Sequence, residues 1–124
     1  MKKILLLGLV LMLSVSLAYA QEDDNVDSME LQGTIVDNIS AAAHVSDMPK
    51  FIRTYSKAKA LEENNARSGY SIFSEGKLMR FDEASSESIA EFLQDPESKL
   101  EVEVEAQKVD YTNELTMITI MNLE

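Results

Sequence analysis

The chain contains no cysteine and only one histidine among its 124 residues. The absence of cysteine excludes disulfides, thiolate nucleophiles and cysteine-ligated zinc. The stability of the folded domain must therefore come from a hydrophobic core alone, which is feasible but modest at this length.

Basic residues are also scarce, with 11 Lys and Arg against 22 Asp and Glu and a formal net charge of −11. Such an acidic surface repels phosphate backbones, whereas proteins that bind nucleic acid usually carry a basic footprint. We therefore predict no nucleic-acid partner and no adsorption to anionic lipid. The same charge favours solubility and attraction of cationic partners.

The first twenty residues have the three parts of a secretory signal peptide. Lys2 and Lys3 precede an apolar run over residues 4–17, and Ala18 and Ala20 supply an A-x-A cleavage site. The run is shorter than the roughly 20 residues that a membrane span needs. Cleavage after Ala20 would leave 104 residues and remove two lysines, for a net charge of −13. We predict a periplasmic or secreted bacterial protein, without membrane insertion after cleavage.

Residues 21–28 (QEDDNVDS) are acidic and nearly devoid of apolar side chains, which predicts a disordered arm before a single domain over residues 29–124. Asp23, Asn25 and Asp27 have the alternate spacing of a calcium loop. Ser28 and Thr34, however, stand where that loop needs Gly and Glu. No metal site and no cofactor are therefore predicted.

Residues 69–82 predict a β-hairpin around which the other elements can be arranged. Glu75 and Gly76 form its two-residue turn, because glycine readily adopts the positive φ that such turns need. The register then pairs Phe73 with Leu78, Ile72 with Met79, Ser71 with Arg80 and Tyr70 with Phe81. The core-facing side chains are Tyr70, Ile72, Met79 and Phe81, and those of the opposite face are Ser71, Phe73, Leu78 and Arg80.

Three further strands are predicted, over residues 29–38, 99–108 and 115–121. Gly33 interrupts the inward row of the first strand, which favours a bend such as those at barrel corners. The second of these strands alternates apolar residues with glutamates, so we expect one buried and one solvated face. The last strand is apolar on both faces towards its end, so we expect both to be covered there.

Two helices complete the predicted fold. Residues 39–45 read as a connection of small residues, after which Ser46 caps a helix whose apolar positions are Met48, Phe51, Ile52 and Tyr55. Ser85 or Ser86 caps a second helix, which Pro96 ends. The fold class is mainly β with two helices (α+β), as a five-stranded OB-fold-like barrel with a helical insertion after strand 1. An open antiparallel sheet with two helices on one face is the alternative.

A family resemblance rests on the signal peptide, GTIVD at residues 33–37, SGY at 68–70, EGKL at 75–78 and the Glu/Val strand. These features resemble small exported bacterial OB-fold-type proteins over about residues 31–120. The resemblance implies a fold and an envelope location but no reaction. Proteins of this kind can carry cysteine near the positions of Ser40, Lys59 and Asn65. This chain has none, so no metal or redox role is carried over.

Five residues are candidate ligand contacts: Asp37, His44, Phe73, Leu78 and Arg80. OB-type barrels bind on one strand face and the adjacent loops. The last three of these residues lie on the outward hairpin face, and His44 lies in the neighbouring loop. His44 could act as a base with Asp37, but no serine has the G-x-S-x-G context of a nucleophile. We predict no catalytic residues.

The preferred function is a non-enzymatic binding module for a small molecule, a peptide or an envelope protein. The alternative is an acidic inhibitor or accessory protein that docks on a basic partner. This alternative is favoured by the row of carboxylates that Glu101, Glu103 and Glu105 form on one strand face. Neighbours in that row are roughly 7 Å apart, which is too far for a compact metal site from this strand alone.

Overall fold

The computed structural model describes residues 28–109 and 111–124. Its strands are β2 (Ser28–Asp37), β3 (Tyr70–Ser74), β4 (Lys77–Phe81), β5 (Glu101–Lys108) and β6 (Glu114–Asn122). Its helices are α2 (Asn38–Ala43), α3 (Met48–Phe51), α4 (Lys57–Ala60), α5 (Glu63–Arg67) and α6 (Glu83–Gln94). The predicted signal peptide and residues 21–27 of the predicted arm lie outside the described residues. Ser28, which we assigned to the arm, is the first residue of β2.

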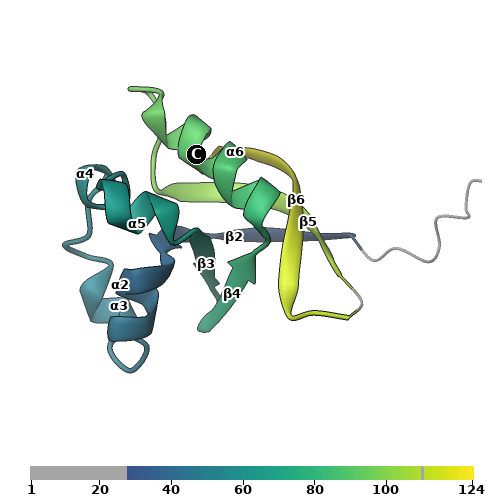
Figure 1. Cartoon of the computed structure of the whole chain (residues 1–124), viewed down its shortest axis with the longest axis horizontal. Coiled ribbons are helices and arrows are strands. Elements are labelled where there is room, and N and C mark those ends of the chain that lie inside the picture. Colours follow the sequence, from purple (N-terminus) through teal and green to yellow (C-terminus); the bar gives the residue numbers. More distant parts are fainter. Residues whose placement is uncertain (1–27, 110) are drawn as a thin grey trace, which may run out of the picture.

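The five strands form one closed sheet in the order β2-β3-β4-β6-β5, with β5 returning to β2 (Figure 1). Every pairing is antiparallel except that of β4 with β6, which is parallel and consists of Arg80 with Glu114 and Phe81 with Leu115. The mixed α+β class and the closed five-stranded sheet agree with the sequence-based prediction. The open antiparallel alternative is wrong. None of the helices in the described ranges is long and apolar enough to cross a membrane.

Strand β2 serves two neighbours. Its residues from Ser28 to Thr34 pair with β5, and those from Thr34 to Asp37 pair with β3. Gly33 lies beside this change of partner, where a Cβ atom would collide with the carbonyl oxygen of Phe73. The glycine therefore permits the close approach of two backbones at the point where the strand leaves one neighbour for the next.

The hairpin of β3 and β4 has the predicted turn and register. Glu75 and Gly76 have φ values of 52° and 78°, as a type I′ turn requires at both central positions. Ser71 pairs with Arg80, Ile72 with Met79 and Phe73 with Leu78. The core side is confirmed in part, since Tyr70, Ile72 and Phe81 are buried and Met79 is half-buried.

Strand β5 confirms its alternating pattern, with Val102, Val104 and Ala106 fully buried. The expectation that both faces of the last strand are covered is wrong, because Ile118 is 44% and Met121 55% exposed. Met121 lies opposite Glu103, on the face that the glutamates occupy. Ile118 falls at an irregularity of the β5–β6 ladder, between the pairs formed by Thr119 and Met117.

The predicted helix from Ser46 is wrong in extent, because the short helices α3 and α4 replace it, and α2 and α5 are two further helices between β2 and β3. Residues 39–45, expected to be a connection, are helical as far as Ala43. Ser56 is extended and caps a new helix, α4, by accepting a hydrogen bond from the N–H of Lys59 at 3.1 Å. Met48 and Tyr55 are nevertheless buried, and Phe51 and Ile52 are half-buried, so the apolar spacing predicted burial in part although the helix is interrupted.

Helix α6 begins one turn earlier than predicted, because Asp82 is its cap. The Asp82 carboxylate accepts hydrogen bonds from the N–H of Ser85 at 2.9 Å and the hydroxyl of Thr116 at 2.7 Å. Burial acts to raise the pKa of Asp82, but these hydrogen bonds hold it below its usual value. Ser85 and Ser86 instead accept from the N–H groups of Met117 and Tyr70, which fastens α6 to two strands.

The burial of the hairpin predicts unequal effects of two phenylalanine truncations. Phe81→Ala is expected to lower the free energy of unfolding by about 3–5 kcal/mol, the usual cost for a core aromatic, because Phe81 is 2% exposed. Phe73→Ala is expected to cost clearly less, because Phe73 is half-buried. Urea unfolding of both variants measures the difference, with Phe81→Leu as a milder substitute if the alanine variant does not fold. A larger loss for Phe73→Ala would contradict the assignment of faces.

Candidate functional site

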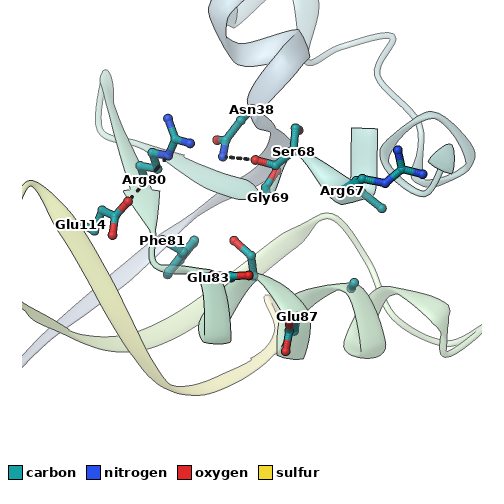
Figure 2. A pocket seen from close by; sticks show the side chains of 12 residues that line it. Asn38, Arg67, Ser68, Gly69, Arg80, Phe81, Glu83, Glu87 and Glu114 are labelled. Atoms are coloured by element: carbon teal, nitrogen blue, oxygen red, sulfur yellow. Dashed lines mark hydrogen bonds and ion pairs between the residues drawn. The ribbon is translucent and has the colours of Figure 1, made fainter. Parts of the chain in front are cut away.

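Two adjoining hollows lie where β4, the end of β2 and α6 meet. The larger, which we name the Arg80 cleft, has a volume of about 440 Å³ and lies between α6 and residues 67–69 (Figure 2). The smaller, the Leu78 hollow, has a volume of about 190 Å³ and is lined by α2 and β4. Asn38 and Arg80 line both hollows, so the two are neighbouring parts of one concave surface.

Asn38 fixes the wall that the two hollows share. Its side-chain Nδ2 donates to the carbonyl of Ser68 at 2.8 Å, and its Oδ1 accepts from the Ser71 hydroxyl at 2.6 Å. Its backbone N–H donates to the carbonyl of Gly69 at 3.0 Å. Gly69 itself has a φ of +88°, a left-handed conformation that favours glycine, and an added Cβ would crowd Asn38 and Ser86. The wall is therefore held by backbone and side-chain bonds together.

The Arg80 cleft carries groups of both charges. The side chain of Arg80 is 61% exposed, and its Nε lies 3.9 Å from Oε2 of Glu114, the residue that it faces across the parallel strand pair. Arg67 is bound to Glu63 at 2.6 Å and points away from the cleft in Figure 2. Glu83 extends from α6 towards the Ser68–Gly69 wall in the same view. The cleft can therefore offer a guanidinium and a carboxylate to one ligand.

The predicted contact residues do not all gather in one place. Leu78 lines the smaller hollow, and Arg80 lines both. Phe73 is half-buried and lines neither of these hollows. Asp37 is fully buried, so its side chain offers no surface to a ligand.

Asp37 instead organises the start of the helical segment. Its Oδ1 accepts from the N–H of Ser40 at 2.8 Å, which caps α2. Its Oδ2 accepts from the hydroxyl of Tyr55 at 2.5 Å, and the same hydroxyl accepts from the Asp37 N–H at 2.9 Å. The buried carboxylate thus joins the end of β2 to the chain after α3.

Two buried phenols lie around this carboxylate. Burial, followed by the hydrogen bond to Asp37, raises the pKa of Tyr55 well above its ordinary value. Burial, followed by the negative charge of Asp37, raises the pKa of Tyr70 to about 12. The hydroxyl of Tyr70 donates to the carbonyl of Ala60 at 2.7 Å, so both phenols are bonded in their neutral form.

His44 pairs with a different acid from the one that the sequence suggested. Its Nδ1 lies 3.1 Å from Oδ1 of Asp47, and its ring stacks on Phe51 with centroids 3.9 Å apart and planes 12° apart. Phe51 in turn contacts Tyr55 at a centroid distance of 5.1 Å. The imidazole is thereby oriented by Asp47 and Phe51, while Asp37 is engaged by Tyr55.

Sequence reasoning missed Asn38, Ser68, Glu83 and Glu114 as cleft residues. Asn38 meets Ser68 because the antiparallel β2–β3 register places Asp37 opposite Tyr70. Glu114 meets Arg80 through the parallel pairing of β4 with β6. Neither register has a local signal in the sequence. Glu83 carried a local signal, since it follows Asp82, a residue type that commonly caps helices.

Within the described ranges, no three carboxylate or imidazole side chains converge closely enough to hold a metal ion. Comparisons of the chain with protein-family models, with curated proteins and with solved structures found no match. The function must therefore be inferred from the arrangement of the residues in the site.

The Asp37–Tyr55 pair predicts a specific loss of stability. Tyr55→Phe removes the hydroxyl that donates to Oδ2 of the buried Asp37 carboxylate and accepts from the Asp37 N–H, while the bond from Ser40 to Oδ1 remains. We expect the free energy of unfolding at pH 7 to fall by about 1–3 kcal/mol. Tyr111→Phe is the matched control, because the side chain of Tyr111 is 91% exposed. Equal effects of the two substitutions in urea unfolding would contradict the role given to Tyr55.

The two phenols also predict weakening in alkali. Both pKa values are raised above the ordinary 10.0, so the folded state keeps the phenols neutral while the unfolded state ionises. Their stabilising contribution is therefore complete below pH 10 and declines above it, and the part due to Tyr70 is lost as the pH rises through about 12. Urea unfolding at a series of pH values checks this, and Tyr55→Phe is expected to show a shallower decline above pH 10 than the unmodified protein.

Proposed function

We propose that this protein is a non-enzymatic binding domain of the bacterial cell envelope, with a small polar molecule or short peptide as its ligand. The observation that carries the proposal is the pair of adjoining hollows that share Asn38 and Arg80. They combine a fixed wall with exposed charged side chains, as ligand sites combine a shaped cavity with a few placed polar groups.

The strand arrangement supports an OB-type barrel. Such barrels have five strands and are partly open. They bind their ligands on the face formed by the second and third strands and in the adjoining loops. In this chain those strands are β3 and β4, and β4 supplies Leu78 and Arg80. The segment between the first two strands supplies Asn38 and α2. The export signal expected in residues 1–20 supports the envelope location.

The surroundings of His44 support a binding role over catalysis. A general base is expected to face a nucleophile or a substrate proton. His44 stacks on Phe51 and pairs with Asp47, so its contacts secure the turn between α2 and α3. His44 is also not among the residues that line either hollow.

Binding to the purified protein by nuclear magnetic resonance tests this proposal. A panel of amino acids, short peptides, sugars and nucleosides is expected to include a compound that shifts the amide resonances of Leu78, Arg80 and Glu114. Arg80→Gln should weaken that binding, because the guanidinium lines both hollows. Lys77→Gln is the control, with the same charge change at an exposed position of the same strand. Hydrolysis or oxidation of a substrate that is lost in His44→Ala would contradict the proposal.

A second function, docking on a basic partner, is favoured by the outer face of β2, β5 and β6. Glu30 lies directly opposite Glu105, a pairing of like charges that is unfavourable in an isolated sheet. Met121 lies opposite Glu103 and, like Ile118, is exposed. A cationic partner with apolar side chains would relieve the repulsion and cover the exposed hydrophobic groups.

Retention of envelope proteins on the immobilised protein tests this second function. A docked basic partner should be released as the salt concentration rises past about 0.15 M, where the Debye length is about 8 Å. Glu103→Gln with Glu105→Gln should weaken retention, whereas Glu91→Gln, an exposed change on α6, should not. Retention that is insensitive to salt and to the paired substitution would contradict a charge-based interface.

A further inference from the structure

We infer, on the basis of the binding function proposed above, that the Arg80 cleft selects a zwitterion: a free amino acid or short peptide with unblocked ends. Its ammonium group would lie against Glu83 and its carboxylate against Arg80. The cleft supplies one suitable group of each sign, the buried hydroxyl of Ser86 and the small side chains of Ala66 and Ala90. Each of these features has its own structural support.

Glu83 is the acceptor for the ammonium group. It is exposed at the first position of α6, and Figure 2 shows its carboxylate directed towards the Ser68–Gly69 wall while Glu87 points away from it. Among the residues that the structure describes, Glu83 forms no ion pair. A carboxylate in a concave site without a cationic partner attracts a cationic ligand group.

Arg80 is the donor for the carboxylate. Its ion pair with Glu114 uses only Nε, at a long distance of 3.9 Å, and the side chain is 61% exposed. The guanidinium therefore retains donors for a ligand. Its planar fork matches a carboxylate in bidentate geometry, which an ammonium such as that of lysine does not.

Ser86 supplies an independent indication of a ligand. It lines the cleft and is only 7% exposed. Its oxygen accepts from the N–H of Tyr70 at 2.9 Å, but its own hydroxyl proton has no acceptor within residues 28–109 and 111–124. A buried hydroxyl usually donates as well as accepts. A carbonyl or carboxylate oxygen of the ligand would complete this bonding.

The size and charge of the cleft favour a zwitterion over other common ligand classes. A volume of about 440 Å³ suits a ligand between an amino acid and a small peptide. Phosphate groups would be repelled by Glu83, Glu87 and Glu114, which outnumber the two arginines of the lining. A neutral sugar would use neither charge. Ala66 and Ala90 are half-buried in the lining and leave room for a ligand side chain.

Calorimetric titration with alanine, dialanine, N-acetyl-dialanine and dialanine amide tests the inference. Dialanine should bind more tightly than either blocked form by about tenfold or more, the equivalent of one charge-assisted hydrogen bond. Glu83→Gln should weaken the binding of dialanine and abolish the difference in affinity between dialanine and N-acetyl-dialanine. Arg80→Gln should weaken the binding of dialanine and abolish the difference in affinity between dialanine and dialanine amide. The two variants therefore show which protein side chain recognises which charge of the ligand.

Matched controls and separate outcomes make the test decisive. Glu91→Gln and Lys77→Gln make the same charge changes at exposed positions outside the cleft, and they should leave dialanine binding within about twofold of the unmodified protein. Equal affinity for dialanine and its blocked forms would overturn the inference. If dialanine fails while a sugar or nucleoside shifts the Leu78 and Arg80 resonances, the inference is wrong but the binding function stands. If no compound of any class shifts them, both are wrong.

Discussion

The hydrogen bonds of the buried Asp37 carboxylate are the interaction on which the rest of this structure depends. A carboxylate with no exposed surface is costly unless donors surround it. Ser40 and Tyr55 provide those donors, one from the helix that the residue caps and one from the chain after α3. This requirement draws a segment of four short helices against the end of β2. Asn38, the next residue, is thereby placed to build the wall of the cleft.

The cleft combines this fixed frame with exposed charged side chains. The wall is set by the bonds of Asn38 to Ser68 and Ser71, whereas the side chain of Arg80 is largely in solvent. Preorganised walls lower the conformational cost of binding, and the exposed charged groups supply electrostatic attraction to a charged ligand. Ser86 belongs to the fixed frame, because it fastens α6 to β3 and also lines the cleft.

Local patterns were enough to predict much of the sheet and little of the site. The Glu75–Gly76 turn and the alternation of β5 depend on neighbouring residues, and both were correct. The segment between β2 and β3 was misjudged because its apolar spacing indicates burial, whereas the extended backbone at Ser56 separates α3 from α4. The exposure of Met121 was missed because hydrophobicity alone does not say whether another element covers a face.

The site was only partly predicted because it depends on pairings between distant parts of the chain. Leu78 and Arg80 were identified from the hairpin, whose register is local. Glu114 enters through a parallel pairing with β4, and Ser86 through a hydrogen bond to β3. No periodicity in the sequence encodes either contact. Asp37 was predicted as a ligand contact for the same reason, since its partner Tyr55 lies beyond two short helices.

The parallel pairing of β4 with β6, which we call the parallel joint, is a weak point of the closed sheet. It comprises two residue pairs, whereas β5 and β6 share seven, so local opening of the sheet should begin there. Arg80, Phe81 and Glu114 belong both to this joint and to the lining of the cleft. A ligand bound in the cleft would therefore contact both strands and stabilise their pairing. Occupancy and closure are thus thermodynamically linked, and amide hydrogen exchange at β4 would report on both.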